Sequence, residues 1–267
     1  MNSRRRAVKR AGEGQIFNCM VFLKDRKMDS PTVADWSCFD RAYCISLTDR
    51  ADRRVTASRQ FAAIGLDHVE FHLVERQADA TKSIYEAHLA CLQKGLAAGA
   101  KRFLVFEDDV IFDRFSPAIL AHIVNFTGSS PDWRILFLGC MVKRSSPTDF
   151  PMIRSIAFQA LTQGYAISEE FAAAILRDHP WHGKPYDDFL RDLPQKGFYA
   201  LYPAIAFQSN SPSDNKPYLA LDFLRRALGG LMRLQKLNEF FHCHRRLIVL
   251  AHVLALALIV VFFWWRR

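Results

Sequence analysis

Three consecutive acids interrupt an apolar run in residues 102–113, "RFLVFEDDVIFD". Carboxylates placed so close together repel one another strongly at low dielectric constant, so a cation or a solvent-exposed turn must relieve them. In an extended chain Glu107 and Asp109 point to one side and Asp108 to the other. Two carboxylates on one side can hold a hard divalent ion and leave positions open for phosphate oxygens. We therefore predict a metal site on Glu107 and Asp109, the alternative being an acidic surface turn.

Strand and helix patterns alternate between residues 39 and 218, and this alternation predicts an α/β fold with a largely parallel sheet. The predicted strands are residues 41–47, 68–74, 102–107 and 133–139, and the predicted helices are a stretch ending at Phe61 and residues 83–99, 115–126 and 168–179. Ser168 is a helix-capping residue type, and residues 143–151 are the most loop-like interior stretch. Ligands of such sheets gather at the carboxyl ends of the strands, where the three acids, Asp49 and Arg50 fall.

Residues 247–265, "LIVLAHVLALALIVVFFWW", are 19 residues without a formal charge. A membrane-spanning helix needs about 20. The 13 Leu, Ile, Val and Phe residues of this stretch contribute about −4 to −8 kcal/mol to insertion, which outweighs the polar His252. More basic residues lie upstream than downstream, so we predict a membrane helix that leaves the domain in the cytoplasm. Six irregularly spaced cysteines without a CxxC pair agree with a reducing compartment. A buried core helix and a helix flat on the surface are the alternatives.

The positive charge of the chain lies at its ends. The net charge is +9, yet residues 11–224 carry 23 Lys and Arg against 26 Asp and Glu, so no nucleic-acid partner is predicted. Residues 1–38 are interpreted as a basic extension, because Glu13 interrupts the apolar run that an export signal needs. Residues 219–246 form a basic amphipathic segment, broken by a pair of glycines, that lies either on anionic lipid or against the domain.

Six blocks of the sequence, in order from about Tyr43 to Asn215, resemble the lipopolysaccharide glycosyltransferases grouped as family 25. The blocks are "CISLTDRADRR", "EAHLACLQKGLAAGAKRFLVFEDDVIF", "DWRILFLG", "TQGYAIS", "PYDDFL" and "YPAIAFQSNSPSD". The resemblance implies a GT-A type fold over residues 39–218, with a Rossmann-like, mostly parallel sheet flanked by helices. It also implies a metal-dependent, inverting transfer of a hexose from a UDP-sugar. The stretch "SIYEAH" departs from the family pattern, because Ala87 stands where members usually carry serine.

The resemblance also assigns roles around the predicted metal site. It implies that Glu107 and Asp109 bridge a Mn²⁺ or Mg²⁺ ion to the diphosphate. Because Asp108 points away from these two, we expect it to reach the sugar or a neighbouring basic group. The residues expected near the nucleotide are Ser46, Leu47, Asp49 and Arg50, with Arg53 or Arg54 as a contact to a phosphate or an acidic group. Neutralising the charge of the UDP leaving group is the largest catalytic contribution available to such an enzyme.

Inversion at the anomeric carbon needs a general base that takes the proton of the acceptor hydroxyl. Asp187 and Asp188 match the downstream acidic block of the family, and we expect Asp188 to be the base. The alternative for either is an ordinary acid at a helix N-terminus. His88 matches a family histidine, and we expect it to support the site, since a lone histidine in an apolar helix is more often a core residue.

The leading prediction is a glycosyltransferase anchored in the inner membrane, with its catalytic domain facing the cytoplasm. Its expected partners are the membrane, a UDP-sugar donor, most commonly of galactose with glucose as the rival, and a lipid-linked saccharide acceptor of lipopolysaccharide or lipooligosaccharide type. A catalytically silent, membrane-anchored scaffold protein is the main alternative, motivated by "SIYEAH". A metal phosphohydrolase is a third, but its His-rich or nucleophilic-Asp context is missing.

Overall fold

The computed structural model describes residues 34–209 and 229–266. Most of the predicted basic extension, residues 1–33, lies outside this range. So do residues 210–228, which include the first part of the predicted amphipathic segment.

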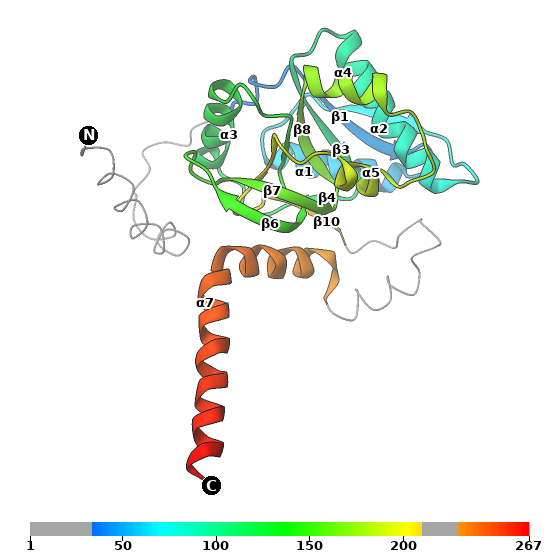
Figure 1. The fold of residues 1–267 in the computed structure, drawn as a ribbon. Helices are drawn as coiled ribbons and strands as arrows, with labels where there is room; N and C mark the ends of the chain where they lie inside the picture. Colours follow the sequence, from blue (N-terminus) through cyan, green and yellow to red (C-terminus); the bar gives the residue numbers. More distant parts are fainter. Residues whose placement is uncertain (1–33, 210–228, 267) are drawn as a thin grey trace. The chain divides into compact units, whose positions relative to one another are not determined.

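Within the described residues, an eight-stranded sheet has the order β2-β1-β3-β8-β5-β9-β7-β6, and β4 pairs with β10 in a separate ribbon (Figure 1). The strands are β1 Arg41–Leu47, β2 Glu70–Val74, β3 Arg102–Glu107, β4 Val110–Phe112, β5 Ile135–Phe137, β6 Met141–Pro147, β7 Ile153–Ala160, β8 Gly164–Ser168, β9 Phe198–Leu201 and β10 Ala206–Gln208. The helices are α1 Ala51–Ala63, α2 Ala80–Ala97, α3 Pro117–Ser129, α4 Glu169–Asp178, α5 Tyr186–Asp192 and α7 Gly230–Trp265.

The sheet is mixed but mostly parallel in strand direction. Strands β2, β1, β3, β5, β9 and β6 run one way, whereas β8 and β7 run the other. With helices on its faces, this sheet confirms the predicted Rossmann-like α/β fold. The antiparallel β8 lies between β3 and β5, and this insertion brings a chain segment of opposite direction to the carboxyl end of β3.

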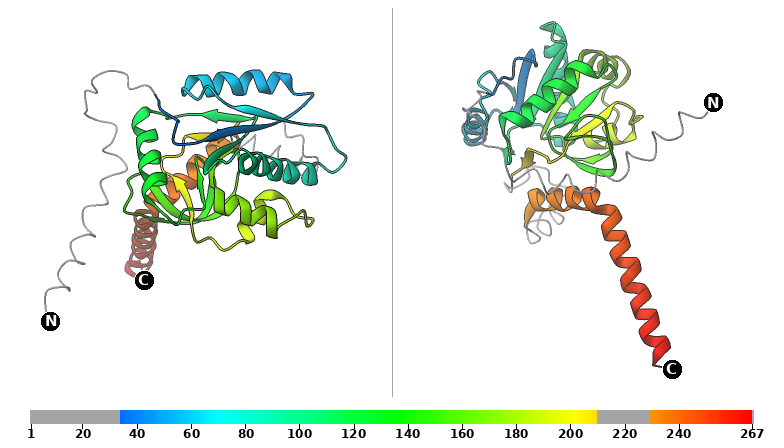
Figure 2. Two further views of the ribbon diagram at one scale, coloured as in Figure 1. Left: turned by 90° about the horizontal axis from the view of Figure 1, so that it is seen from above. Right: turned by 90° about the vertical axis from the view of Figure 1, so that its left-hand side faces the viewer.

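Alternate residues of β3 belong to two different cores. Leu104 and Phe106 pack with α1 and α3 on one side of the sheet, whereas Phe103 and Val105 pack with α2, α4 and α5 on the other. Figure 2 shows α1 on one side of the strands and α2 with α4 on the opposite side. Burial on both faces explains why β3 is almost continuously apolar, as buried central strands are. It also places the acids at the end of a rigid strand.

Two predictions at the level of local structure have clear outcomes. Ser168 caps α4 as predicted, its Oγ accepting a hydrogen bond from the amide of Phe171 at 3.4 Å. The predicted loop at residues 143–151 is wrong for its first part, which belongs to β6 and pairs with β7, and is confirmed for residues 148–151, which connect the two strands. Strand β6 lies at the edge of the sheet, and much of its surface is exposed, so its polar sequence lacks the apolar signature of a strand.

Helix α7 begins at a pair of glycines, Gly229 and Gly230, whose φ angles are 93° and 86°. Positive φ angles of this size favour glycine, which explains why the helix starts there. The helix continues without interruption to Trp265, and its residues from Val249 onward are exposed. Among the described residues, it is the one helix long and apolar enough to cross a membrane.

Candidate functional site

The acids lie where two parallel strands end side by side. Strand β3 ends at Glu107, which pairs in register with Ile45 of β1. The turn that follows is fixed by its backbone, because the amide of Glu107 donates to the carbonyl of Gln163 at 3.2 Å and the amide of Asp108 donates to the carbonyl of Ile45 at 3.1 Å. The directions in which the three side chains point are therefore set by the sheet.

Asp108 points toward β1 and α1. Its carboxylate accepts from Ser46 Oγ at 2.7 Å and from Arg53 Nη1 at 3.2 Å. Burial raises the pKa of Asp108 above its usual range, although the Ser46 hydrogen bond and the Arg53 charge act against that rise. Arg54 organises the same corner by donating to the carbonyl of Leu47 at 2.6 Å. The structure thus brings together the predicted residues Ser46, Leu47, Arg54 and Asp108, and Arg53 contacts an acidic group, Asp108, as one of the two expected arginines.

Two residues predicted near the nucleotide have other partners. Asp49 accepts from Arg76 Nε at 3.1 Å, and Arg50 Nε donates to Asp52 at 3.1 Å, both in exposed surroundings. The structure does not bring them into contact with the acids. Sequence spacing places both residues just after β1, but it does not show which way a side chain turns beyond the strand.

Glu107 and Asp109 belong to a second group of contacts, away from Asp108. Thr162 Oγ1 donates to Glu107 Oε1 at 2.8 Å, and Gln208 Nε2 donates to Asp109 Oδ2 at 2.8 Å. The other oxygen, Asp109 Oδ1, is buried and has no hydrogen-bond partner among the described residues. A buried carboxylate oxygen left without a donor is costly, and a bound cation would remove that cost.

The two carboxyl groups differ in their pKa. Burial, followed by the charge of Glu107, raises the pKa of Asp109 to about 7. Burial also raises the pKa of Glu107, but the contacts to His88 and Thr162 and the charge of Arg53 bring it below its usual value. Two neighbouring carboxylates repel each other, so the pKa of one of them is raised while the other stays ionised.

The donor set fits a hard cation that is only partly enclosed by protein. Within the part of the chain that the structure describes, no group of three His, Cys, Asp or Glu side chains could hold a metal ion. Glu107 and Asp109 would therefore be two protein ligands of Mn²⁺ or Mg²⁺. The remaining positions would be left to water or a ligand's oxygens, which is the way Mg²⁺ is commonly bound beside phosphates.

His88 lies behind Glu107, in the middle of an aromatic cluster. Its ring stacks on Tyr186 with centroids 4.1 Å apart, and its Nδ1 lies 3.0 Å from the hydroxyl of Tyr165. Its Nε2 lies 3.8 Å from Glu107 Oε1. This separation is too long for a hydrogen bond, and Nε2 has no hydrogen-bond partner among the described residues. His88 therefore packs beside Glu107 as part of the aromatic cluster.

Asp187, rather than Asp188, joins this group. Asp187 accepts from the amide of Leu161 at 2.9 Å, and its Oδ1 lies 3.0 Å from Thr162 Oγ1, so one threonine hydroxyl, with a single proton to donate, contacts both Asp187 and Glu107. Burial, and then the charge of Glu107, raise the pKa of Asp187. Asp188 instead pairs with Arg191 at 2.7 Å and is 38% exposed. Both acids were candidates from the sequence, and we expected Asp188 to be the base. In the structure it is Asp187 that shares Thr162 with Glu107.

Thr162 and Gln208 carry no titratable group, and sequence reasoning gave them no role although both lie within the quoted blocks. Thr162 precedes β8, whose Gly164 pairs with Phe106 of β3. Gln208 ends β10, where it pairs with Val110. Only the strand pairing brings them to the acids, so the one available signal was their place in those blocks.

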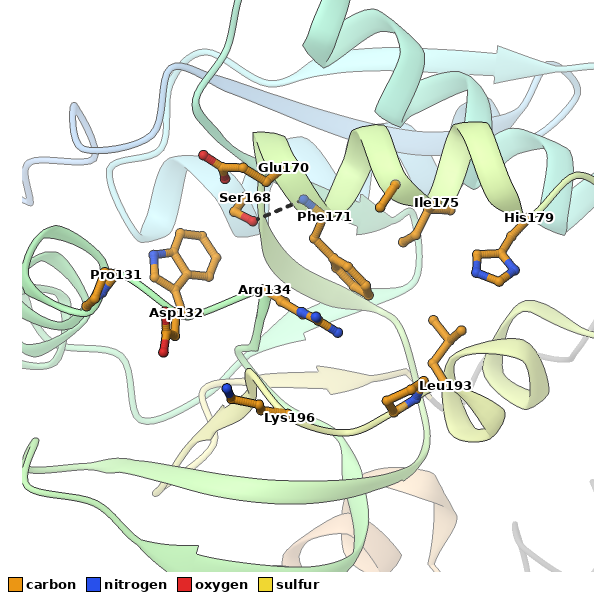
Figure 3. A pocket seen from close by; sticks show the side chains of 13 residues that line it. Pro131, Asp132, Arg134, Ser168, Glu170, Phe171, Ile175, His179, Leu193 and Lys196 are labelled. Atoms are coloured by element: carbon orange, nitrogen blue, oxygen red, sulfur yellow. Dashed lines mark hydrogen bonds between the residues drawn. The ribbon is translucent and has the colours of Figure 1, made fainter.

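A pocket of about 460 Å³ lies elsewhere, near the start of β5 and the first turns of α4, and contains none of the predicted site residues (Figure 3). Arg134 and Lys196 line it together with Asp132 and Glu170. Ser168, which also lines it, pairs with Arg102 at the beginning of β3, at the opposite end of that strand from Glu107. The charged residues that line this pocket are of both signs, and the pocket is separate from the acidic site.

No protein-family model matches the chain, and no curated protein matches its sequence. Among solved structures, the chain is similar to A197 from STIV, with 12% identity and a TM-score of 0.44, over 63% of this chain and 85% of that one. It is also similar to mannose-1-phosphate geranyltransferase from Thermus thermophilus, with 11% identity and a TM-score of 0.36, over 60% of this chain and 73% of that one. A third similar structure is a glycosyltransferase involved in the glycosylation of the major capsid of PBCV-1. It has 12% identity and a TM-score of 0.31, over 55% of this chain and 72% of that one. Scores this low carry no argument about activity, so the resemblance to family 25 stays a prediction.

Replacing Thr162 by valine removes the hydroxyl that contacts Glu107 and Asp187 while keeping the shape of the side chain. We expect the Thr162→Val variant to bind Mn²⁺ about tenfold more weakly, since loss of such an outer contact costs roughly 10–100-fold in affinity. Electron paramagnetic resonance of free Mn²⁺ measures the change. Thr56→Val, on the exposed side of α1, is the matched control. Equal affinities of the two variants would mean that Thr162 does not orient a metal ligand.

Proposed function

We propose that the protein is a metal-dependent, inverting glycosyltransferase that moves a hexose from a UDP-sugar to a lipid-linked saccharide at the cytoplasmic face of the inner membrane. One observation carries the proposal: Glu107 and Asp109 lie together at the carboxyl end of β3, beside parallel β1, and one buried oxygen of Asp109 has no donor within the part of the chain that the structure describes. A parallel α/β sheet binds ligands at this end, and a diphosphate together with a divalent cation suits such a pair of acids.

On the donor side, Glu107 and Asp109 would hold Mn²⁺ or Mg²⁺. When bound, the ion would offset the negative charge that develops on the UDP leaving group. Arg53 and Asp108 neutralise each other beside the acids at 3.2 Å, which keeps a third carboxylate from adding its repulsion. Ser46, Leu47 and Arg54 shape the β1–α1 corner, where we place the nucleotide. The donor sugar is galactose, with glucose as the alternative.

On the acceptor side, we assign the general base to Asp187. Its raised pKa makes it a stronger base than an ordinary aspartate, and the amide of Leu161 with the hydroxyl of Thr162 fixes its orientation. Asp188 is the alternative base, but its carboxylate pairs with Arg191 at 2.7 Å, whereas Asp187 shares Thr162 with Glu107. In this assignment the acceptor hydroxyl approaches from the side of β8 and α5.

Membrane attachment is assigned to α7. Its apolar part runs from Leu247 to Trp265, and the turns before it already expose large apolar side chains: Leu237 is 55%, Phe240 54% and Phe241 42% exposed. Apolar side chains beside arginines such as Arg233 and Arg245 are typical of helices that lie in the lipid headgroup region. The basic residues that precede Leu247 favour an orientation with the domain in the cytoplasm. A site held at that surface suits an acceptor that is itself lipid-linked.

Asp109→Asn tests the metal assignment, because an amide cannot replace the charge that a carboxylate offers a divalent ion. With a panel of UDP-hexoses, we expect transfer by the wild type to require Mn²⁺ or Mg²⁺ and the variant to lose at least about a hundredfold in kcat. Asp67→Asn, at an exposed position, is the control. Metal-independent transfer that survives Asp109→Asn contradicts the assignment, and failure of the wild type to bind UDP with Mn²⁺ favours the scaffold alternative.

The choice of base gives a second comparison between two neighbouring residues. We expect Asp187→Asn to lower kcat by about 10²–10⁴, the range for loss of a general base, and Asp188→Asn to lower it only a few-fold. Both kcat values are measured at saturating donor, and thermal unfolding of both variants checks that the fold is kept. The reverse order of effects would return the role to Asp188.

Removal of residues 243–267 tests the anchor. The deletion keeps His242 and the earlier contacts of α7 but removes the apolar stretch, so we expect the shortened protein in the soluble fraction after cell lysis. Fractionation followed by a wash in high salt measures it, with the full chain as the reference. If the shortened protein stays with membranes after that wash, another surface provides the attachment.

A further inference from the structure

The first turns of α7 dock on the domain through polar side chains that share one helix face. Gln235, Asn238, Glu239 and His242 follow the i, i+3, i+4, i+7 spacing of one helix face, and each contacts the domain. Gln235 is completely buried. Glutamine is seldom fully buried, and burying its amide without partners is costly, so its contacts define where the helix is held.

Gln235 joins three chain segments. Its Nε2 donates to the carbonyl of Ala206 in β10 at 2.9 Å, and its Oε1 accepts from Gln163 Nε2 at 3.3 Å. Gln163 Nε2 also lies 3.0 Å from the carbonyls of Gly139 and Ala206. A Cβ atom at Gly139 would come 1.8 Å from the Ala206 oxygen and 2.6 Å from Gln235 Nε2. The cluster therefore requires glycine at 139 so that the backbone can approach.

Two of these segments lead directly to the acids. The carbonyl of Gln163 accepts from the amide of Glu107, and the preceding residue is Thr162, whose hydroxyl contacts Glu107. Gln208 follows Ala206 by two residues in β10 and donates to Asp109. Each proposed metal ligand is thus linked to the Gln235 amide by two hydrogen bonds, through Gln163 for Glu107 and through β10 for Asp109.

The neighbours of Gln235 hold the strand that follows the acids. Lys236 Nζ pairs with Asp113 at 2.6 Å, and Glu239 accepts from Arg114 Nη1 at 3.0 Å. Asp113 and Arg114 come directly after β4, which begins at Val110, next to Asp109. Helix α7 therefore also contacts the chain just after β4, the strand that follows the acids.

We infer that Gln235 is a positioning residue of the acidic site, acting through Gln163 and Ala206, so that the helix carrying the apolar stretch is also a structural part of that site. Loss of the amide frees the segments that end in Thr162 and Gln208, and Glu107 and Asp109 lose their fixed separation. The inference rests on the proposed function only for the identity of the ligands, a divalent ion and a UDP-sugar. The coupling between α7 and the acids is a property of the fold.

The test compares Gln235→Met, which keeps length and helix propensity but cannot hydrogen-bond, with Gln93→Met on the exposed side of α2. Both are made in the full chain and studied in lipid nanodiscs. For Gln235→Met we expect faster hydrogen exchange in peptides covering residues 160–164 and 205–209, and about tenfold weaker Mn²⁺ binding. With the UDP-hexose that the wild type uses, kcat falls about tenfold while KM for the donor changes less than about twofold. Gln93→Met matches the wild type in every readout.

Glu239→Gln is a milder variant, because it weakens the ion pair with Arg114 and keeps an oxygen that accepts from the amide of Ala204. It replaces Gln235→Met in the same measurements if Gln235→Met does not fold. It is expected to change Mn²⁺ affinity and exchange in the same direction by a few-fold. Unchanged exchange in both peptides overturns the inference. Faster exchange with unchanged Mn²⁺ affinity and kcat also overturns it, since Gln235 would then be merely structural. If the wild type transfers no hexose, the proposed function fails. The hydrogen-exchange rates and the Mn²⁺ affinity of the variants then still show whether α7 positions the acids.

Discussion

Repulsion between three adjacent carboxylates is the constraint on which the rest of the structure depends. The fold relieves it by separating the side chains onto two sides of the strand. Asp108 is neutralised by Arg53 and bonded by Ser46, whereas Glu107 and Asp109 receive neutral donors, Thr162 and Gln208. Neutral donors hold the orientation of a carboxylate without cancelling its charge. Glu107 therefore keeps its negative charge, whereas the pKa of Asp109 is raised to about 7, and a bound divalent cation would favour the charged form of Asp109.

The surrounding elements supply those donors by topology. Strand β8 runs antiparallel to β3, and this direction places the residues just before Gly164 beside the end of β3. Strand β10 pairs with β4 immediately after the acids and contributes Gln208. Both segments meet at Gln235 of α7. A site built from a strand end, two neighbouring segments and one helix depends on tertiary contacts more than on any single motif.

The sequence predicted best where local pattern and tertiary environment agree. Strands β1 and β3 have their predicted bounds, because they are apolar runs buried on both faces. Strand β6 was missed because an edge strand can be polar. Glu107 and Asp109 could be named from alternation, but their donors could not, since threonine and glutamine have no chemical signature of their own. The choice between Asp187 and Asp188 depends on the rotation of the short helix α5, which sequence spacing does not fix.

The central claim is that Glu107 and Asp109 hold a divalent ion against a diphosphate. Pulsed electron–nuclear double resonance on the full chain with Mn²⁺ and UDP tests it directly, because the hyperfine coupling of ³¹P reports phosphate oxygens bound to the metal. We predict a ³¹P coupling that requires both the protein and UDP. It is expected to be stronger than the coupling for UDP with Mn²⁺ bound at random sites. It is also expected to disappear in a Glu107→Gln, Asp109→Asn double variant. A ³¹P signal unchanged in the double variant, or no protein-dependent signal in the wild type, would contradict the account.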